Sequence, residues 1–394
     1  MERFYFQLLL CIFACMLSSC ATIESGDANN TDTVHEATPD PSADCPQKNQ
    51  SWTFLFYIVA DDGSQSFDTS TARYLNTMPT LPDNVEALVL LDRCVSAYWP
   101  ISTTEGRVLD TCAQLYRIRK DGTPDLLDMS PYKLSWLDDS SGDVNMGSAA
   151  TLTSFIQFGM EQIETTNYGL ILSGHGNGDQ VGFDSTNDSS LNHQELGFAL
   201  EKAMDTGDVC RSKLDLVVMA ACAMATAGVY SSLTPYVDWL IASQENIYGY
   251  NLAWMHELGS QSSDGSISTQ EISTALIQGR VTGVLGTGQQ VTLDLSDENS
   301  QALQTLVAEV GAILNANQTD RGDLEDAAFN PRTFDFRMVA EKVGDNALLE
   351  RVDTLLNKTV IEQTELSEEL GPKLEAHGIS VTTSDLGLAG SLIF

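Results

Sequence analysis

Short apolar runs that end abruptly in small or acidic residues constrain the fold of this chain more than any other feature of its sequence. The first run, WTFLFYIVA at residues 52–60, is followed at once by two aspartates and a glycine. Such runs predict strands that are buried on both faces, as parallel sheets require. Further strands are expected at residues 85–91, 113–118, 168–172, 214–219 and 237–242.

Helical patterns separate these runs. Apolar residues at helical spacing predict a helix over residues 148–163, with Asn145 or Ser148 as its cap. A second helix is expected over residues 191–204, where Asn192 and Glu195 have the spacing of a capping box. A third helical pattern covers residues 224–233. The alternation of strands and helices predicts an α/β fold with a mainly parallel central sheet and helices on both faces.

The predicted core spans residues 51–260, and a helical and mixed C-terminal region, residues 261–394, is expected to pack on it. The helical patterns of this region cover residues 270–280, 298–315, 323–341 and 346–370. Strand-like pieces lie at residues 289–295 and 377–382.

The N-terminus predicts export and a lipid anchor. Residues 1–19 contain an apolar stretch that is too short to span a membrane and ends in Leu-Ser-Ser before Cys20. This pattern is typical of a bacterial lipoprotein signal peptide, after whose removal Cys20 is acylated. The alternative is an ordinary secretory signal with an incidental cysteine. Residues 20–50 are polar and predict a flexible linker. The expected location is the bacterial cell envelope, at the outer membrane or the cell surface, and Ala21 after Cys20 favours the outer membrane in a cell that has two membranes.

The charge of the chain excludes some partners. The sequence has 20 Lys and Arg against 55 Asp and Glu, a formal net charge of −35. Such a polyanion is repelled by nucleic acid and by anionic lipid surfaces, so membrane contact is expected only through the anchor. Solubility outside the cytoplasm is the simplest explanation of the acidity, and a cationic partner or several calcium sites are the alternatives. The sequence does not indicate an oligomeric state.

Five cysteines remain once the signal peptide and Cys20 are set aside, and export permits disulfides. The preferred pair is Cys94–Cys112, which flanks a loop-like insertion, and Cys45–Cys210 is the weaker second pair. The alternative is that all four are unpaired. Either way Cys222 remains as a thiol.

One histidine and one cysteine follow directly after predicted strands. His175 lies between two glycines after residues 168–172, and Cys222 follows residues 214–219, 47 residues later in the chain. Because the carboxyl ends of parallel strands meet at one edge, the two side chains are expected to lie close together. An imidazole can take the proton of a thiol, and the amides of Gly176 and Cys222 could hold an oxyanion. We also expect Cys222 to open a helix whose dipole favours a thiolate. The alternative is a buried, inert cysteine.

Several ordered blocks resemble the clostripain family of cysteine peptidases. These blocks are WTFLFYIVADD, VEALVLLDR, NMGSAATLTSFIQFGMEQI, NYGLILSGHGNGDQVGFD, LDLVVMAACAMATAGVY and VDWLIASQEN, with looser similarity at VTLDLSD and HGISVTT. The resemblance covers roughly residues 51–384. It implies a caspase-like fold and a cysteine endopeptidase acting on proteins or peptides, with His175 as base, Cys222 as nucleophile and Gly176 as an oxyanion donor.

The sequence departs from that family at Ala220, where the family usually has an aspartate that helps to bind Arg or Lys before the scissile bond. An alanine cannot pair with a cation, so a strict preference for Arg is not expected. Glu245 or Asp184 could supply a carboxylate in its place. For the same reason self-cleavage between the His and Cys strands is not expected.

The remaining hypotheses concern metals and other functions. No Cys/His spacing matches a zinc site, and no cofactor is required for the chemistry. Asp61, Asp62 and Asp68 could bind calcium, although a solvated turn is the favoured interpretation. A catalytically inactive binding or adhesion lipoprotein, and a transpeptidase with the same dyad, are the alternative functions.

Overall fold

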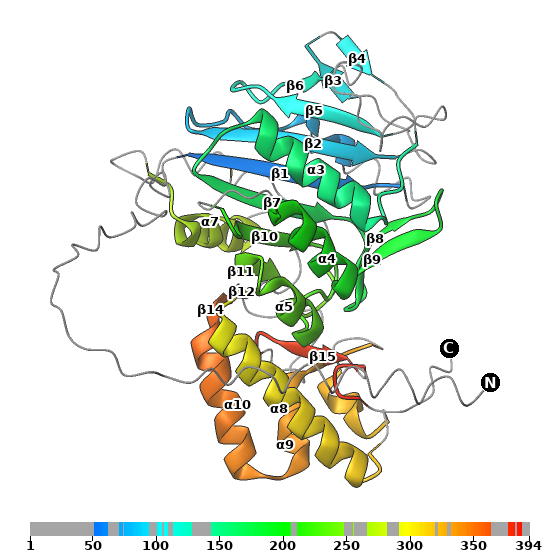
Figure 1. Cartoon of the computed structure of the whole chain (residues 1–394), viewed down its shortest axis with the longest axis vertical. Coiled ribbons are helices and arrows are strands. Elements are labelled where there is room, and N and C mark those ends of the chain that lie inside the picture. Colours follow the sequence, from blue (N-terminus) through cyan, green and yellow to red (C-terminus); the bar gives the residue numbers. More distant parts are fainter. Residues whose placement is uncertain are drawn as a thin grey trace, which may run out of the picture. The chain divides into compact units, whose positions relative to one another are not determined.

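Five parallel strands form the centre of a nine-stranded sheet (Figure 1). In spatial order they are β2 (Val85–Asp92), β1 (Trp52–Val59), β7 (Asn167–Ser173), β10 (Leu214–Ala220) and β11 (Val237–Ala242). Every residue of β1 and β10 is buried, as a sheet that is covered on both faces requires. The apolar runs of the sequence therefore predicted these five strands correctly.

The computed structural model describes residues 51–61, 71–73, 75–93, 101–104, 106–108, 113–127, 143–205, 211–247, 255, 266–281, 291–319, 322–328, 332–363, 377–382 and 384–387. The predicted signal peptide, Cys20, the linker and the four cysteines of the predicted disulfides lie outside these residues. No helix among the described residues is long and apolar enough to cross a membrane.

Antiparallel strands extend both sides of this parallel centre. Next to β2 lie β5 (Gln114–Ile118) and β6 (Pro124–Leu126). Next to β11 lie β12 (Val291–Asp294) and β14 (Val360–Gln363), which come from the C-terminal part of the chain. The region after residue 260 thus contributes strands to the main sheet, and residues 44–394 form one compact unit.

Helices cover both faces of the sheet. On one face lie α3 (Ala149–Gln162), α4 (His193–Met204) and α5 (Ala227–Leu233), which are drawn in front of the sheet in Figure 1. On the other face α7 (Thr269–Val281) and the helical residues 71–73 and 75–76 contribute to a second apolar cluster. The capping box of α4 is confirmed, because Asn192 accepts from the Glu195 amide and Glu195 accepts from the Asn192 amide.

The C-terminal region differs from two of the predicted helices. Residues 323–341 do not form one helix, but a 3₁₀ turn (Gly322–Ala327), β13 (Thr333–Asp335) and α9 (Phe336–Val343). The break occurs because the Asp335 carboxylate accepts the Met338 amide and so starts a new helix. The predicted helix 346–370 ends early as α10 (Asn346–Thr359), since β-branched residues continue the chain as β14.

Two further elements of the C-terminal region follow the sequence pattern. They are α8 (Asp297–Ala316) and β15 (Ser380–Thr382), which pairs with β13.

Two small hairpins escaped prediction from the sequence. One pairs β8 (Gln180–Asp184) with β9 (Ser189–Asn192), and the other pairs β3 (Ile101–Thr103) with β4 (Gly106–Val108). Their strands are too short and too polar to show a clear alternation of apolar residues. The run of Asp, Ser, Thr and Asn at residues 184–189 was the available signal for the turn of the first hairpin. In the structure Asp188 has a φ of 48° there.

Candidate active site

His175 and Cys222 lie at matching positions beyond two adjacent parallel strands. Ser173, the last residue of β7, pairs with Ala220, the last residue of β10. His175 and Cys222 each follow two residues later in the chain. The His175 side chain is exposed, while Cys222 is half-buried and carries a thiol. The predicted convergence of the two strand ends is therefore present in the fold.

Gly176 brings the two loops into direct contact. A Cβ atom placed on Gly176 would lie 2.5 Å from the Cys222 carbonyl oxygen and 3.1 Å from the Cys222 amide nitrogen. Real Cβ atoms do not approach so closely, so only glycine allows the His loop to pack on the main chain of Cys222. The glycine beside the histidine is thus a requirement of packing between the loops.

The loop that carries His175 is fixed by the hairpin that follows it. The Gly182 amide donates to the His175 carbonyl at 2.9 Å, and Gly176 forms an isolated bridge with Val181. The Asn177 side-chain oxygen accepts the amides of the two residues at positions 179 and 180. These bonds give the exposed histidine a defined backbone although its side chain reaches solvent.

The sulfur of Cys222 lies against the backbone of Ile247, in the loop that follows β11. The Ile247 amide donates to Sγ at 3.4 Å, and Sγ lies 3.6 Å from the Ile247 carbonyl oxygen. The carbonyl oxygen accepts a hydrogen bond from the thiol, whereas the amide can donate to the thiolate and so stabilise it once the thiol has lost its proton. Ile247 thereby contacts the sulfur in either protonation state, which the sequence alone did not indicate.

The expected helix dipole at Cys222 is absent, and that prediction was wrong. Helix α5 begins only at Ala227, with Thr226 as its cap. Between them the chain makes a turn in which Ala223 has a φ of 60°, a conformation that costs a non-glycine residue about 1–3 kcal/mol. The Ala223 amide donates to the Glu245 carbonyl at 2.9 Å, and this bond helps to hold the turn.

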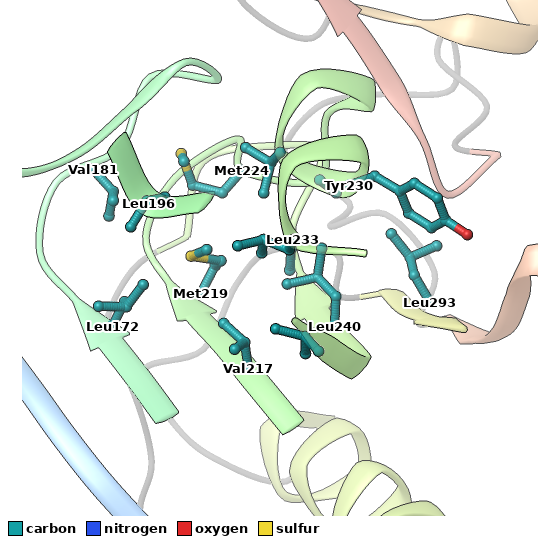
Figure 2. Close-up of a cluster of buried hydrophobic side chains, with 14 of the residues drawn as sticks. Leu172, Val181, Leu196, Val217, Met219, Met224, Tyr230, Leu233, Leu240 and Leu293 are labelled. Carbon is teal, nitrogen blue, oxygen red and sulfur yellow. The ribbon is translucent and has the colours of Figure 1, made fainter. Parts of the chain in front are cut away.

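Apolar side chains pack below the two loops, on the face of the sheet that α3, α4 and α5 cover. Figure 2 shows Leu172 of β7, Met219 of β10, Val181 of β8 and Met224 of the turn after Cys222 in one group. All four are almost completely buried. This packing fixes the strand ends on which the two loops depend.

Ala220 lies on the opposite face of the sheet, where it packs in an apolar cluster. It shares that face with Cys222, two residues further along the chain. The cluster around them includes Ile58, Ile241 and Ile247. Ala220 is only 6% exposed, so its side chain lies within this apolar cluster, against which Cys222 also packs.

The two proposed substitute carboxylates occupy different places. Glu245 is buried in the loop after β11, and its carbonyl oxygen accepts the Ala223 amide. Asp184 ends β8, and its carboxylate accepts the amides of Met146 and Asn187. The structure thus brings Glu245, but not Asp184, into contact with the loop of Cys222 among the described residues.

Asp184 belongs to a group of three buried carboxylates. Oxygen atoms of Asp61, Asp92 and Asp184 all lie within 4.8 Å of one another. Carboxylate oxygens are the ligands that calcium takes, so these three residues fit such an ion by their chemistry. The expectation of a solvated turn is wrong at Asp61, which is completely buried, and Asp62 and Asp68 lie outside the described residues. Burial raises the pKa of Asp184, and burial together with the charges of Asp184 and Asp92 raises the pKa of Tyr57.

Two other histidines pair with carboxylates away from Cys222. Nδ1 of His193 lies 2.7 Å from an oxygen of Asp179, and Nδ1 of His377 lies 2.9 Å from an oxygen of Asp335. Neither histidine was assigned a role from its sequence context. Asp335 was found only in the structure, because its position depends on the antiparallel pairing of two strands that are far apart in the chain.

Comparisons with known proteins agree with this geometry. A profile described as the clostripain family matches residues 56–330. No curated protein sequence matches the chain. Among solved structures, the chain is similar to a secreted C11 cysteine protease from Bacteroides thetaiotaomicron in complex with an irreversible peptide inhibitor. The two are 17% identical, with a TM-score of 0.57 over 84% of this chain and 92% of that chain.

Two further structures give similar values. Iotapain, a secreted C11 cysteine protease from the same organism, is 15% identical, with a TM-score of 0.58 over 87% of this chain and 97% of that one. An inactive zymogen C11 protease from Parabacteroides distasonis is 16% identical, with a TM-score of 0.57 over 86% and 93%. At these identities the likeness shows the fold.

The fold and these matches define the class of protein: it is a cysteine-type peptidase with a caspase-like α/β fold. Since the matching profile spans well over half of the sequence, the chain belongs to the clostripain family. The resemblance seen in the sequence blocks is thereby confirmed.

Proposed function

We propose that the chain is an endopeptidase that acts through a dyad of Cys222 and His175. The observation that carries this proposal is the pairing of Ser173 with Ala220, which sets the two side chains at the same height beyond adjacent parallel strands. The contact of Gly176 with the main chain of Cys222 supports it, because it joins the two loops directly.

The first half of the reaction forms an acyl-enzyme. His175 takes the proton of the Cys222 thiol, and the sulfur attacks the carbonyl carbon of the scissile peptide bond. The amides of Gly176 and Cys222 hold the oxyanion that forms as the carbonyl double bond opens. As the intermediate collapses, the carbon–nitrogen bond breaks and His175 gives its proton to the departing amine.

The second half releases the acyl group to water. His175 takes a proton from a water molecule, which attacks the thioester carbon. The carbon–sulfur bond then breaks, the thiolate of Cys222 is reprotonated and the carboxylic acid product leaves. These steps use only groups of the chain and water, so we propose that catalysis requires no cofactor. A calcium ion held by Asp61, Asp92 and Asp184 would act on stability and not on the reacting bonds.

We further propose that the enzyme lacks a strict preference for Arg or Lys before the scissile bond. The support is the buried apolar cluster in which Ala220 packs and against which Cys222 lies. Burying a cation in such surroundings without a partner is costly. Self-cleavage at Lys202, Arg211 or Lys213 is therefore not part of the proposed maturation, and the active form is the uncut chain.

The proposed location is the bacterial cell envelope, with residues 1–19 removed and lipid attached to Cys20. The two similar B. thetaiotaomicron proteases are secreted proteins, which supports export of this chain. Globomycin treatment of expressing cells and mass spectrometry of the mature N-terminus would test this proposal. An unmodified N-terminus at another residue would contradict it.

Labelling with an irreversible peptide electrophile tests the dyad itself. We expect one adduct, on Cys222, and none in the Cys222→Ala variant. The rate of labelling should fall in His175→Ala, because the thiol then lacks its base. A chain that binds peptides without reacting at Cys222 would instead favour the inactive binding module. A product joined to an added amine would indicate transpeptidation.

A further inference from the structure

A small ribbon from the C-terminal region lies against the loop that carries Cys222. Strands β13 and β15 form this ribbon, with Phe334 paired to Val381. The Ser380 amide donates to the Ala225 carbonyl at 2.8 Å, and Ser380 also forms a bridge with Thr226. A Cβ on Gly178 would lie 2.3 Å from a methyl group of Thr333, so the ribbon also touches the loop that follows His175.

Asp335, at the end of the ribbon, is a completely buried hydrogen-bond acceptor for three different segments. One oxygen accepts the Met338 amide at 3.0 Å and lies 2.9 Å from Nδ1 of His377. The other oxygen accepts the His377 amide at 3.0 Å and the Gln244 side-chain amide at 3.1 Å. The last bond connects the ribbon to the loop that follows β11.

Gln244 is completely buried, and both N–H donors and the oxygen of its side-chain amide make hydrogen bonds. Nε2 donates to Asp335 and, at 3.2 Å, to the Ser380 hydroxyl. Oε1 accepts the Gly378 amide at 2.7 Å. A reversed amide would place its oxygen against the Asp335 carboxylate, so this orientation is strongly preferred.

The main chain on either side of Gln244 holds the turn after the nucleophile. The Ser243 carbonyl accepts the Ala225 amide at 2.8 Å, and the Glu245 carbonyl accepts the Ala223 amide at 2.9 Å. Ala223 is the residue with positive φ. The Ile247 amide, three residues after Gln244 in the chain, donates to the sulfur of Cys222. The position of Gln244 therefore controls both the strained turn and the contact with the sulfur.

We infer that Gln244 and Asp335 are positioning residues for Cys222, and that the C-terminal ribbon is in this way part of the catalytic apparatus. The inference rests on the nucleophile role proposed above for Cys222. Neither residue touches the reacting atoms. They act by fixing the backbone from which the sulfur is presented, and a small displacement of a nucleophile has a large effect on turnover.

Gln244→Glu provides the sharpest test, since it keeps the shape of the side chain but adds an acid beside Asp335. At pH 7.5 we expect kcat to fall about tenfold or more, with KM within about twofold of wild type. The new carboxyl is buried next to a carboxylate, which raises its pKa. As the pH falls it gains a proton and can donate to Asp335 as the amide does. The kcat of the variant relative to wild type should therefore recover toward acidic pH.

Other charged groups also face this position. The ring of His377 contacts Asp335, and the pKa of Arg337 on α9 is raised chiefly by its hydrogen bond to Asp353, with a smaller contribution from the charge of Asp335. Glu245 adjoins Gln244 in the chain. For this reason the kcat of the variant is divided by that of wild type at each pH, which removes the titration common to both proteins.

Matched controls separate positioning from general effects of charge or capping. Gln301→Glu adds the same charge on an exposed position of α8 and should leave kcat unchanged. Asp335→Asn should lower kcat, whereas Asp345→Asn, at the comparable cap of α10, should not. Gln244→Leu, which removes the amide without adding charge, should lower kcat at every pH.

Hydrogen exchange supplies a readout that does not depend on catalysis. We expect the amides of Ala223 and Ala225 to exchange faster in Gln244→Leu than in wild type, and no change in Gln301→Glu. Unchanged exchange in Gln244→Leu, or an unchanged kcat in an active enzyme, would overturn the inference. If Cys222→Ala keeps full activity, the proposed nucleophile is wrong, and the exchange rates alone then decide whether Gln244 holds this turn.

Discussion

Gly176 and Cys222 are packed so closely that a methyl group on the glycine would lie 2.5 Å from the cysteine carbonyl oxygen. This contact joins the ends of two neighbouring strands and brings an imidazole and a thiol to one edge of the sheet. The chemistry proposed for the chain depends on this approach of the two backbones. Several measurements follow from it and from the groups around it.

Gly176→Ala should abolish most of the activity with little loss of fold. The added methyl must push the His loop away from Cys222, and a displacement of about 1 Å can cost about 100-fold in rate. We expect kcat/KM on a peptide substrate to fall by about that factor. Gly344→Ala is the control: it lies at a helix end with φ of 76° and open space around it, so it should lower the melting temperature but not kcat. Full activity of Gly176→Ala would refute the close approach.

Loss of either dyad member should reduce turnover far more than it reduces stability. Cys222→Ala and His175→Ala are each expected to lower kcat by about 1,000-fold or more, and the double variant no further, because the two act as a unit. His175 is exposed, so its replacement should change the free energy of unfolding by about 0.5 kcal/mol or less. Additive losses in the double variant would argue against a dyad.

A peptide panel should show cleavage after uncharged residues without dominance of Arg or Lys. The reason is the apolar cluster that includes Ala220 and Ile247. In Ala220→Asp the ratio of kcat/KM for Arg over apolar residues should rise, since a cation then has a carboxylate partner close to Cys222. If wild type strongly prefers Arg and Glu245→Gln loses this preference, Glu245 is instead the carboxylate that binds the Arg side chain of the substrate.

The three buried carboxylates predict an unusual dependence of stability on pH. Burial raises the pKa of Asp184 in the folded state above its unfolded value, so the folded chain binds this proton more tightly. The contribution of Asp184 to folding is therefore fully present below its unfolded pKa and is lost as the pH rises through its folded pKa. Asp61→Asn should remove the neighbouring charge that also raises the pKa of Asp184 and so weaken this pH dependence, as chemical denaturation between pH 4.5 and 7.5 would show. An identical pH dependence in Asp61→Asn and wild type would contradict this account.

Removing divalent cations should leave the chemistry intact. The dyad needs only a thiol, an imidazole and water, so kcat in EDTA is expected to equal kcat in calcium when measured well below the melting temperature. Calcium is expected to act, through Asp61, Asp92 and Asp184, on the melting temperature alone. A loss of kcat in EDTA that calcium restores would place the ion in the catalytic cycle.

The central strands, and the positions of His175 and Cys222 just beyond two of them, could be predicted from the sequence because their signals are local. A run such as residues 52–60 must be buried on both faces wherever it lies, and the chain direction alone puts His175 and Cys222 just beyond such runs. The capping box of α4 is local in the same sense. The prediction that a helix begins at Cys222 was wrong, because four residues of irregular turn separate Cys222 from α5. The spacing of apolar residues does not reveal the positive φ at Ala223 that forms this turn.

The sequence by itself thus determined a parallel sheet with a thiol and an imidazole at one edge, since apolar runs and chain order are sufficient for that. Only the tertiary structure decided that Ile247 contacts the sulfur, that Asp61, Asp92 and Asp184 meet, and that Asp335 binds Gln244. Gln244 and Asp335, for example, are 91 residues apart in the chain. Local periodicity carries no information about which distant segments will lie side by side, because the packing of the whole core selects them.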